Sequence, residues 1–192
     1  MGALTTISAV NLHLFGATTG TSDDALLTQL INQASDDIAG RCNRTLTRET
    51  RTAEKYTGDG GTKLYLDLYP VFSVAAVTVD GEAVTDYTII AKAGMLEREN
   101  GWDYDAEILV TYTGGYLLTT IPAVTGPPAV AEIPRDLPHN LEYAAILWVA
   151  GAYNSRGSEH LSDEAIGPLK SVFWAEQPAI KAVVDKYRRI NI

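Results

Sequence analysis

The chain has 192 residues, of which 46% are hydrophobic and 20% charged, and its formal net charge is -9. A chain of this length suits one domain, or one domain with an insertion, and can fold without a disulfide or a metal. Its one cysteine, Cys42, excludes an intrachain disulfide framework. No Lys or Arg precedes Arg41, and the longest strongly apolar run, 144–153, is far shorter than the roughly 20 residues that span a bilayer. We therefore expect a soluble intracellular product with no membrane partner.

Charged residues are unevenly distributed along the chain. Acidic residues dominate between 80 and 107, whereas basic residues cluster at 41–51 and again at 181–189. A protein with an acidic surplus does not grip DNA by counterion release, because that requires Lys and Arg side chains facing phosphates. Such a protein can still surround DNA without holding it; the simpler interpretation is that the charge maintains solubility.

Residues 1–45 are predicted to form the N-terminal helices. Thr6 or Ser8 can cap a short helix that ends at Gly16 and carries the apolar residues Ile7, Val10, Leu12 and Leu14. Ser22 or Asp23 can cap a longer helix. In that helix apolar residues recur every three or four positions, at Leu27, Ile31, Ala34, Ile38 and Cys42. The spacing predicts one buried face, on which Cys42 is a core residue and not a nucleophile.

Residues 50–116 are predicted to form a small antiparallel sheet of four to six short strands. Leu64, Leu66 and Leu68 alternate with polar residues, as in a half-buried strand. Valines alternate up to Asp80-Gly81, a dipeptide that suits a tight hairpin turn. Further strands are expected at 87–90, 95–96 and 108–112.

The loop at 117–138 contains five prolines, so no regular element is expected to run through it. Helices are predicted again from 139 to 192. Asp136 can cap a helix that has Pro138 in its first turn and runs to about residue 155. The middle of this helix, 144–150, is apolar on all sides, which indicates burial on several sides, in part against another subunit. A polar loop to Trp174 precedes a last helix that begins at Pro178.

No pattern in the chain predicts a catalytic, cofactor-binding or metal site, and we expect no cofactor. The histidines lie in unrelated segments and lack partners at metal-ligand spacing; they are His13, His139 and His160. The glycine-rich segment 58–63 lacks the Gly-Lys-Ser/Thr ending of a phosphate loop and precedes a predicted strand, so it is interpreted as a turn. Asp103 and Asp105 lie beside Trp102 and could form the carboxylate pair of a glycosidase, although a solvated loop is the preferred interpretation.

Short motifs along nearly the whole chain, taken in their order, resemble one known family. They are the helix 23–38 with its exit at 41–46, the segments Tyr69-Pro70-Val71 and 77–81, the run 110–116, and Ile133-Pro134-Arg135 before an alanine-rich helix. This order resembles the head–tail connector, or neck adaptor, proteins of long-tailed phages and gene-transfer particles. The resemblance implies an α+β fold, mainly a helical bundle with an inserted small antiparallel β-sheet. It also implies a single adaptor domain over 1–192, made of N-terminal helices (1–45), a β-rich insertion (50–116), a proline-rich loop (117–138) and C-terminal helices (139–192).

The resemblance further implies a structural virion protein and not an enzyme. Homo-oligomeric rings of twelve copies are expected between the portal and a head-completion (stopper) or tail protein, assembled in the host cytoplasm. Double-stranded DNA would pass through the ring without sequence-specific binding. The last helix is hypothesised to dock on the portal. Candidate portal or subunit contacts are Trp148, Tyr153, Trp174, Ile180, Val183, Val184, Tyr187, Arg188 and Arg189.

Three alternatives stay open at this point. One is another neck or tail-completion role, such as a head-completion or tail-terminator protein, which is expected to be dominated by β-structure. Another is a carbohydrate-binding or hydrolytic module that uses Asp103 and Asp105. The third is a cytosolic multimer of unrelated function.

Overall fold

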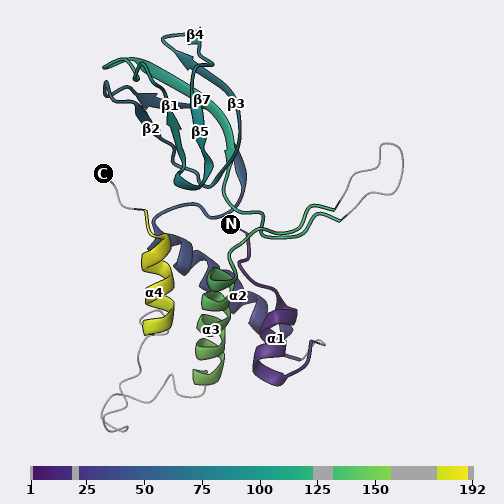
Figure 1. Cartoon of the computed structure of the whole chain (residues 1–192). Helices are drawn as coiled ribbons and strands as arrows, with labels where there is room; N and C mark the ends of the chain where they lie inside the picture. The colour runs from purple at the N-terminus through teal and green to yellow at the C-terminus, as the bar shows by residue number, and fades with distance from the viewer. Residues whose placement is uncertain (1, 19–21, 123–131, 157–176, 190–192) are drawn as a thin grey trace, which may run out of the picture. The chain divides into compact units, whose positions relative to one another are not determined.

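A computed structural model describes residues 2–18, 22–122, 132–156 and 177–189 (Figure 1). The chain forms two compact units: a helical unit from residues 1–44 and 136–192, and a β unit from residues 45–135. The α+β class is therefore confirmed. The expectation of a mainly helical bundle is not confirmed, because the strands build a unit of their own with its own apolar core.

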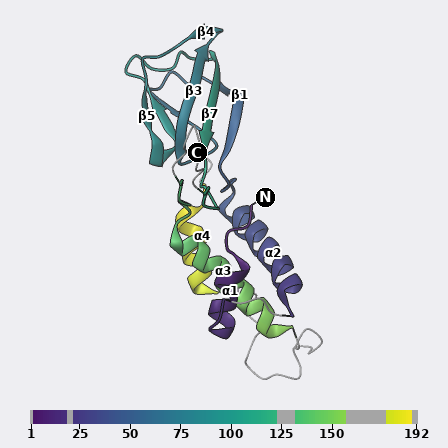
Figure 2. The same ribbon diagram turned by 90° about the vertical axis from the view of Figure 1, so that its right-hand side faces the viewer.

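Four helices make up the described part of the helical unit: α1 (Ile7–Phe15), α2 (Asp24–Cys42), α3 (His139–Ser155) and α4 (Pro178–Tyr187). Helix α3 contacts each of the other three helices (Figure 2). Helix α2 also contacts α1 and α4. None of the helices in the described residues has both the length and the apolar character that crossing a membrane requires.

The two N-terminal helices follow their predicted limits closely. Thr6 caps α1 by accepting a hydrogen bond from the Ala9 N–H at 3.2 Å, and Gly16 ends the helix at a φ of 69°. The predicted stripe of α2 is buried along its whole length, at Leu27, Ile31, Ala34, Ile38 and Cys42. In α1, Val10 is buried whereas Leu12 is 55% exposed, because the other helices cover only part of α1.

Helix α3 begins later than predicted. Pro138 is its N-cap and has an extended ψ of 130°, and the Leu141 N–H donates to the Pro138 carbonyl at 3.0 Å. Asp136 is therefore not the cap, and Pro138 does not lie in the first turn. The apolar middle of α3 is buried on several sides, as predicted, and α1, α2 and α4 supply that burial. Its buried residues are Ala144, Ala145, Trp148, Val149 and Ala150.

The β unit contains two antiparallel sheets in place of the single sheet predicted. One has the order β1-β7-β3-β4 and is formed by β1 (Glu49–Thr57), β7 (Glu107–Gly114), β3 (Val71–Val79) and β4 (Glu82–Ala83). The other has the order β2-β6-β5 and is formed by β2 (Lys63–Tyr65), β6 (Met95–Glu97) and β5 (Thr88–Ile90), with the 3-10 helix η1 (Ala91–Ala93) after β5. The strands predicted within 64–68, 77–79, 87–90, 95–96 and 108–112 are all present, although β2 is only three residues long.

The core of the β unit explains the alternating pattern of its strands. Inward-facing residues of β7 alternate with exposed or half-exposed ones, so that Ile108, Val110 and Tyr112 are buried. They pack with Val77 and Val79 of β3 in the same sheet, and with apolar residues of the second sheet and of the segments around it, among them Leu64, Leu66, Leu68, Leu96 and Trp102. The predicted turn at Asp80-Gly81 is confirmed: both residues have positive φ, 50° and 87°, as a tight hairpin turn requires.

The proline-rich loop forms a narrow ribbon where it is described. The Ile121 N–H donates to the Ile133 carbonyl at 2.9 Å, and the Ile133 N–H donates back at 3.0 Å. Both isoleucines are largely exposed, at 44% and 42%. Residues 123–131 of this loop lie outside the described residues.

Candidate interaction surface of the helical unit

The described residues contain no group of His, Cys, Asp or Glu side chains that could hold a metal ion. His13 is exposed on α1, His139 is the exposed first residue of α3, and His160 lies outside the described residues. Cys42 is buried at the end of α2, and this burial raises the pKa of its thiol. A nucleophilic cysteine needs a lowered pKa, so the structure agrees with a core role for Cys42.

The carboxylate pair weighed as a glycosidase site lies in an exposed loop. Trp102 is 1% exposed, so its ring is not open to stack on a sugar. Asp103 and Asp105 are exposed, and the loop is fixed to the glycine-rich turn by backbone hydrogen bonds such as Asp105 N–H to the Gly58 carbonyl at 2.8 Å. The arrangement agrees with the interpretation of a solvated loop.

A polar network in the β unit was not predicted from the sequence. The hydroxyls of Tyr56 and Tyr112 both donate to one oxygen of Glu54, at 2.6 Å each. The same hydroxyls accept the backbone N–H groups of Asp67 and Leu68 at 3.1 Å. Burial, followed by the hydrogen bond to Glu54, raises the pKa of Tyr112 to about 12, and the same causes raise the pKa of Tyr56. The network joins β1, β7 and the segment before β3, and its role is structural.

The raised pKa of Tyr112 predicts a loss of stability in alkali. Below pH 10 the hydroxyl is protonated in the folded and the unfolded chain, so its contribution is fully present; between pH 10 and about 12 only the unfolded chain ionises. The free energy of unfolding should therefore fall across this interval as the pH rises. Denaturant titrations at a series of pH values should show a shallower fall for Tyr112→Phe. Tyr104→Phe, at an 83% exposed position, is the control and should leave the slope unchanged. Equal slopes for all three proteins would contradict the prediction.

Two of the predicted interface aromatics pack inside the helical unit. Trp148 is 6% exposed, and its indole N–H donates to the Asp37 carboxylate of α2 at 3.2 Å. Tyr153 is buried as well, and its hydroxyl donates to the carboxylate of Asp23. Both side chains therefore tie α3 to the two ends of α2. Another candidate aromatic, Trp174, lies outside the described residues.

The candidates on α4 divide between its buried and its open side. Ile180 and Val184 are buried, and Val183 and Tyr187 are half-buried. The Tyr187 hydroxyl donates to Asn140 at 2.9 Å. After the helix, Arg188 is exposed, whereas the half-buried Arg189 donates its backbone N–H to the Cys42 carbonyl at 2.8 Å. Of the predicted contacts in the described residues, Arg188 is thus the most open to a partner.

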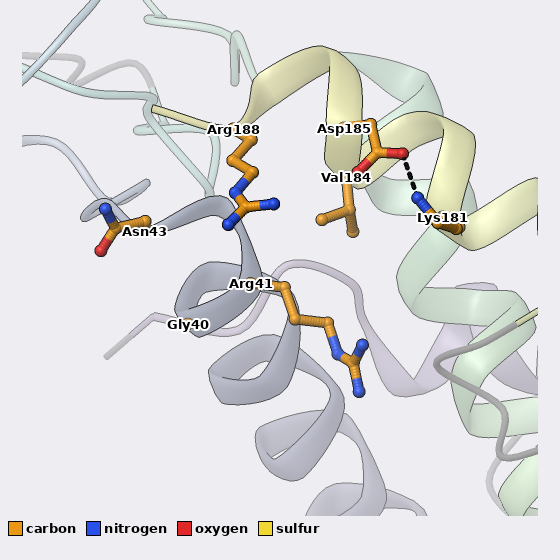
Figure 3. A pocket seen from close by; sticks show the side chains of 7 residues that line it. All are labelled: Gly40, Arg41, Asn43, Lys181, Val184, Asp185 and Arg188. Atoms are coloured by element: carbon orange, nitrogen blue, oxygen red, sulfur yellow. Dashed lines mark hydrogen bonds and ion pairs between the residues drawn. The ribbon is translucent and has the colours of Figure 1, made fainter. Parts of the chain in front are cut away.

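A cleft of about 830 Å³ lies between the end of α2 and α4 (Figure 3). The end of α2 contributes Gly40, Arg41 and Asn43; α4 and its exit contribute Lys181, Val184, Asp185 and Arg188. The α4 positions recur at three and four residues, so they share one face of the helix. Arg41 pairs with Asp37 at 3.0 Å and Lys181 with Asp185 at 2.6 Å, while the Arg188 side chain reaches toward the end of α2. The fold thus brings Arg41 of the first basic cluster to one cleft with Lys181 and Arg188 of the second.

Comparisons with known proteins agree with an assembly role. A family model described as head completion protein matches residues 3–190. A chain in a structure described as the virion of a native gene transfer agent particle is 18% identical, with a TM-score of 0.51, over 97% of this chain and 90% of that chain. A chain in the neck of an empty gene transfer agent particle, computed with C6 symmetry, is 18% identical with a TM-score of 0.50 over the same shares. No curated protein matches the chain.

The family match confirms the resemblance to neck connector proteins that the sequence motifs indicated. It also corrects one criterion. A head-completion role was set apart as β-dominated, yet the matching family carries that description and this chain has both helices and sheets. The proportion of β-structure therefore does not separate an adaptor from a head-completion protein.

Proposed function

Because the chain belongs to the head completion protein family, we propose that it is a structural subunit of the neck that joins head and tail in a phage or gene-transfer particle. The observation that carries this proposal is the family match, which spans parts of both units. A shared fold with chains of a gene transfer agent virion and a gene transfer agent neck supports the location in the virion. The functional surfaces of such a protein are interfaces with other subunits.

Identical copies are proposed to close into a ring, of twelve copies as the resemblance to neck adaptors implies, around a channel for double-stranded DNA. The similar neck computed with C6 symmetry supports a cyclic arrangement. The net charge of -9 favours a channel that does not hold DNA, because phosphate contacts need a surplus of basic residues. The portal on one side and a stopper or tail protein on the other are the proposed neighbours.

Docking on the portal is proposed for the outer face of α4. Ala179, Ala182 and Lys186 are exposed and recur at three and four residues, on a different side of the helix from the cleft. Deleting 178–192 would be a poor test of this docking, because Ile180 and Val184 belong to the core of the helical unit. A substitution on the exposed face leaves that core intact.

We expect Lys186→Glu to weaken binding to the cognate portal about tenfold, since reversal of an interface charge replaces attraction with repulsion. Circular dichroism should show unchanged helix content. Lys92→Glu, an equal change of charge at the exposed η1 position, is the matched control and should bind as the wild type does. Affinity can be measured by biolayer interferometry and the assembly imaged by electron microscopy. A wild-type chain that neither binds the portal nor forms a ring in its presence would overturn the proposed function.

A further inference from the structure

Gly40 lines the cleft and, having no side chain, leaves space there. It lies in the last turn of α2, where alanine would form a more stable helix. A Cβ added at Gly40 would meet no atom of the described residues within 4 Å, and the backbone there is helical. Neither the backbone conformation nor packing against the part of the chain that the structure describes therefore requires glycine. The missing side chain leaves room for the close approach of another chain.

The charges in the cleft favour an acidic occupant. Arg41, Lys181 and Arg188 line it; Asp37 pairs with Arg41 and Asp185 with Lys181, so the surplus is one positive charge. Carbonyl groups at the end of α2 already accept hydrogen bonds, among them that of Gly40 from the Asn43 N–H at 3.0 Å. A carboxylate that enters the cleft would therefore meet cationic side chains, and the carbonyls at the end of α2 would remain paired with their own donors.

An acidic surface of the same chain is available on the β unit, which carries 13 Asp and Glu residues against 7 Lys and Arg. Strands β1 and β3 end and β7 begins at one end of this unit, where Thr57 pairs with Glu107 and the Asp80 N–H donates to the Glu107 carbonyl at 2.9 Å. The glycine-rich turn and the loop before β7 lie at the same end. Exposed carboxylates gather there, at Asp59, Asp80, Glu82, Asp103, Asp105 and Glu107; we call them the acidic end. Lys55 pairs with Glu107.

We propose that the cleft between α2 and α4 binds the acidic end of the β unit of a second copy of this chain. The inference rests on the proposed ring, because each subunit of a ring offers two different surfaces to its two neighbours. The basic cleft and the acidic end are such a pair of unlike surfaces. Opposite charges on them would also set the direction of assembly and discourage contacts between like surfaces.

Zero-length cross-linking of carboxylates to amines tests the contact directly. A mixture of unlabelled and ¹⁵N-labelled protein is treated with a carbodiimide at the highest soluble concentration, and the peptides are mapped by mass spectrometry. We expect Lys181 to be joined to a carboxylate of the acidic end in peptides that combine the two labels. Mixed-label peptides that map elsewhere, or none at all, would overturn the inference.

Matched variants distinguish a specific contact in the cleft from the effect of a changed net charge. Arg188→Glu should weaken self-association about tenfold, measured by sedimentation equilibrium, whereas Lys92→Glu, the same reversal at the exposed η1 position, should leave it unchanged. Gly40→Gln should strengthen the fold yet weaken association, because its side chain occupies the cleft; a purely structural glycine would not produce this opposition. Equal effects of Arg188→Glu and Lys92→Glu would overturn the inference.

The outcomes also distinguish this inference from the proposed function. Rings that form on the portal with Arg188→Glu as well as with the wild type would remove the cleft contact and leave the neck role standing. If Lys181 is cross-linked to the acidic end but the protein binds no portal, the cleft contact stands and the proposed neck role is wrong. If a short DNA duplex binds the wild type and loses affinity with Arg188→Glu, while no mixed-label cross-links form, the cleft is a phosphate site and the inference is wrong.

Discussion

Replacing Trp148 with alanine is expected to destabilise the helical unit by about 3–5 kcal/mol. The side chain is 6% exposed in the middle of α3, where α1, α2 and α4 all contact this helix. Its removal leaves a cavity and takes away the hydrogen bond that the indole N–H donates to Asp37. Denaturant unfolding followed by far-UV circular dichroism should show the loss as a lower midpoint.

Tyr143→Ala is the matched control on the same helix. Tyr143 is 53% exposed, so its truncation should change the free energy of unfolding by no more than about 0.5 kcal/mol. If Trp148→Ala proved as mild as this control while it abolished assembly, the interface assignment of Trp148 would be favoured over the core assignment. Any assembly assay with Trp148→Ala therefore needs the stability of the free subunit beside it.

Helices were predictable because their signals are local. Thr6 and Gly16 mark the two ends of α1, and the stripe from Leu27 to Cys42 has the spacing of one buried helical face. Pro178 marks the start of α4. The start of α3 was misplaced because a proline is acceptable both as a cap and in the first turn, and no local pattern separates the two.

The β unit was only partly predictable. Alternation identified the inner residues of β3 and β7, but nothing local assigns strands to one sheet or two. Strand β1 was missed as a separate element because its inward positions include Glu54 and Tyr56, polar groups that become acceptable in the interior only through their hydrogen bonds with each other and with Tyr112. That network depends on contacts between distant segments, which periodicity does not report.

The cleft was present in the sequence only as two separate basic clusters. Arg41 and Arg188 are far apart along the chain, and the packing of α4 against α2 is what brings both to one cleft. Residue type alone also did not predict which aromatic side chains are buried, because Trp and Tyr are equally common as interface anchors and as core residues. Trp148 and Tyr153 therefore fitted both roles. The structure places both in the core of the helical unit, so the search for partner contacts moves to the exposed charges of α4.

Gly58→Ala is expected to destabilise the β unit by about 3 kcal/mol, at the upper end of the usual cost of overpacking. A Cβ at Gly58 would lie 1.9 Å from the backbone oxygen of Asp103, so the two loops would have to separate. Their separation would weaken the hydrogen bonds that Gly58 makes with Ala106 at 3.0 Å and with Asp105 at 2.8 Å. Amide hydrogen exchange should report lower protection in the β unit.

Gly40→Ala gives the opposite expectation and serves as the control. Its Cβ meets no atom within 4 Å among the residues that the structure describes, and alanine favours the helix by about 0.5–1 kcal/mol over glycine. The contrast bears on the one segment that resembled a phosphate loop. If Gly58→Ala is costly in the free protein, the glycine is needed for the close approach of the two loops, and no bound phosphate is required to explain it. If it is harmless, that close approach is wrong, and the glycine-rich segment again needs a functional explanation.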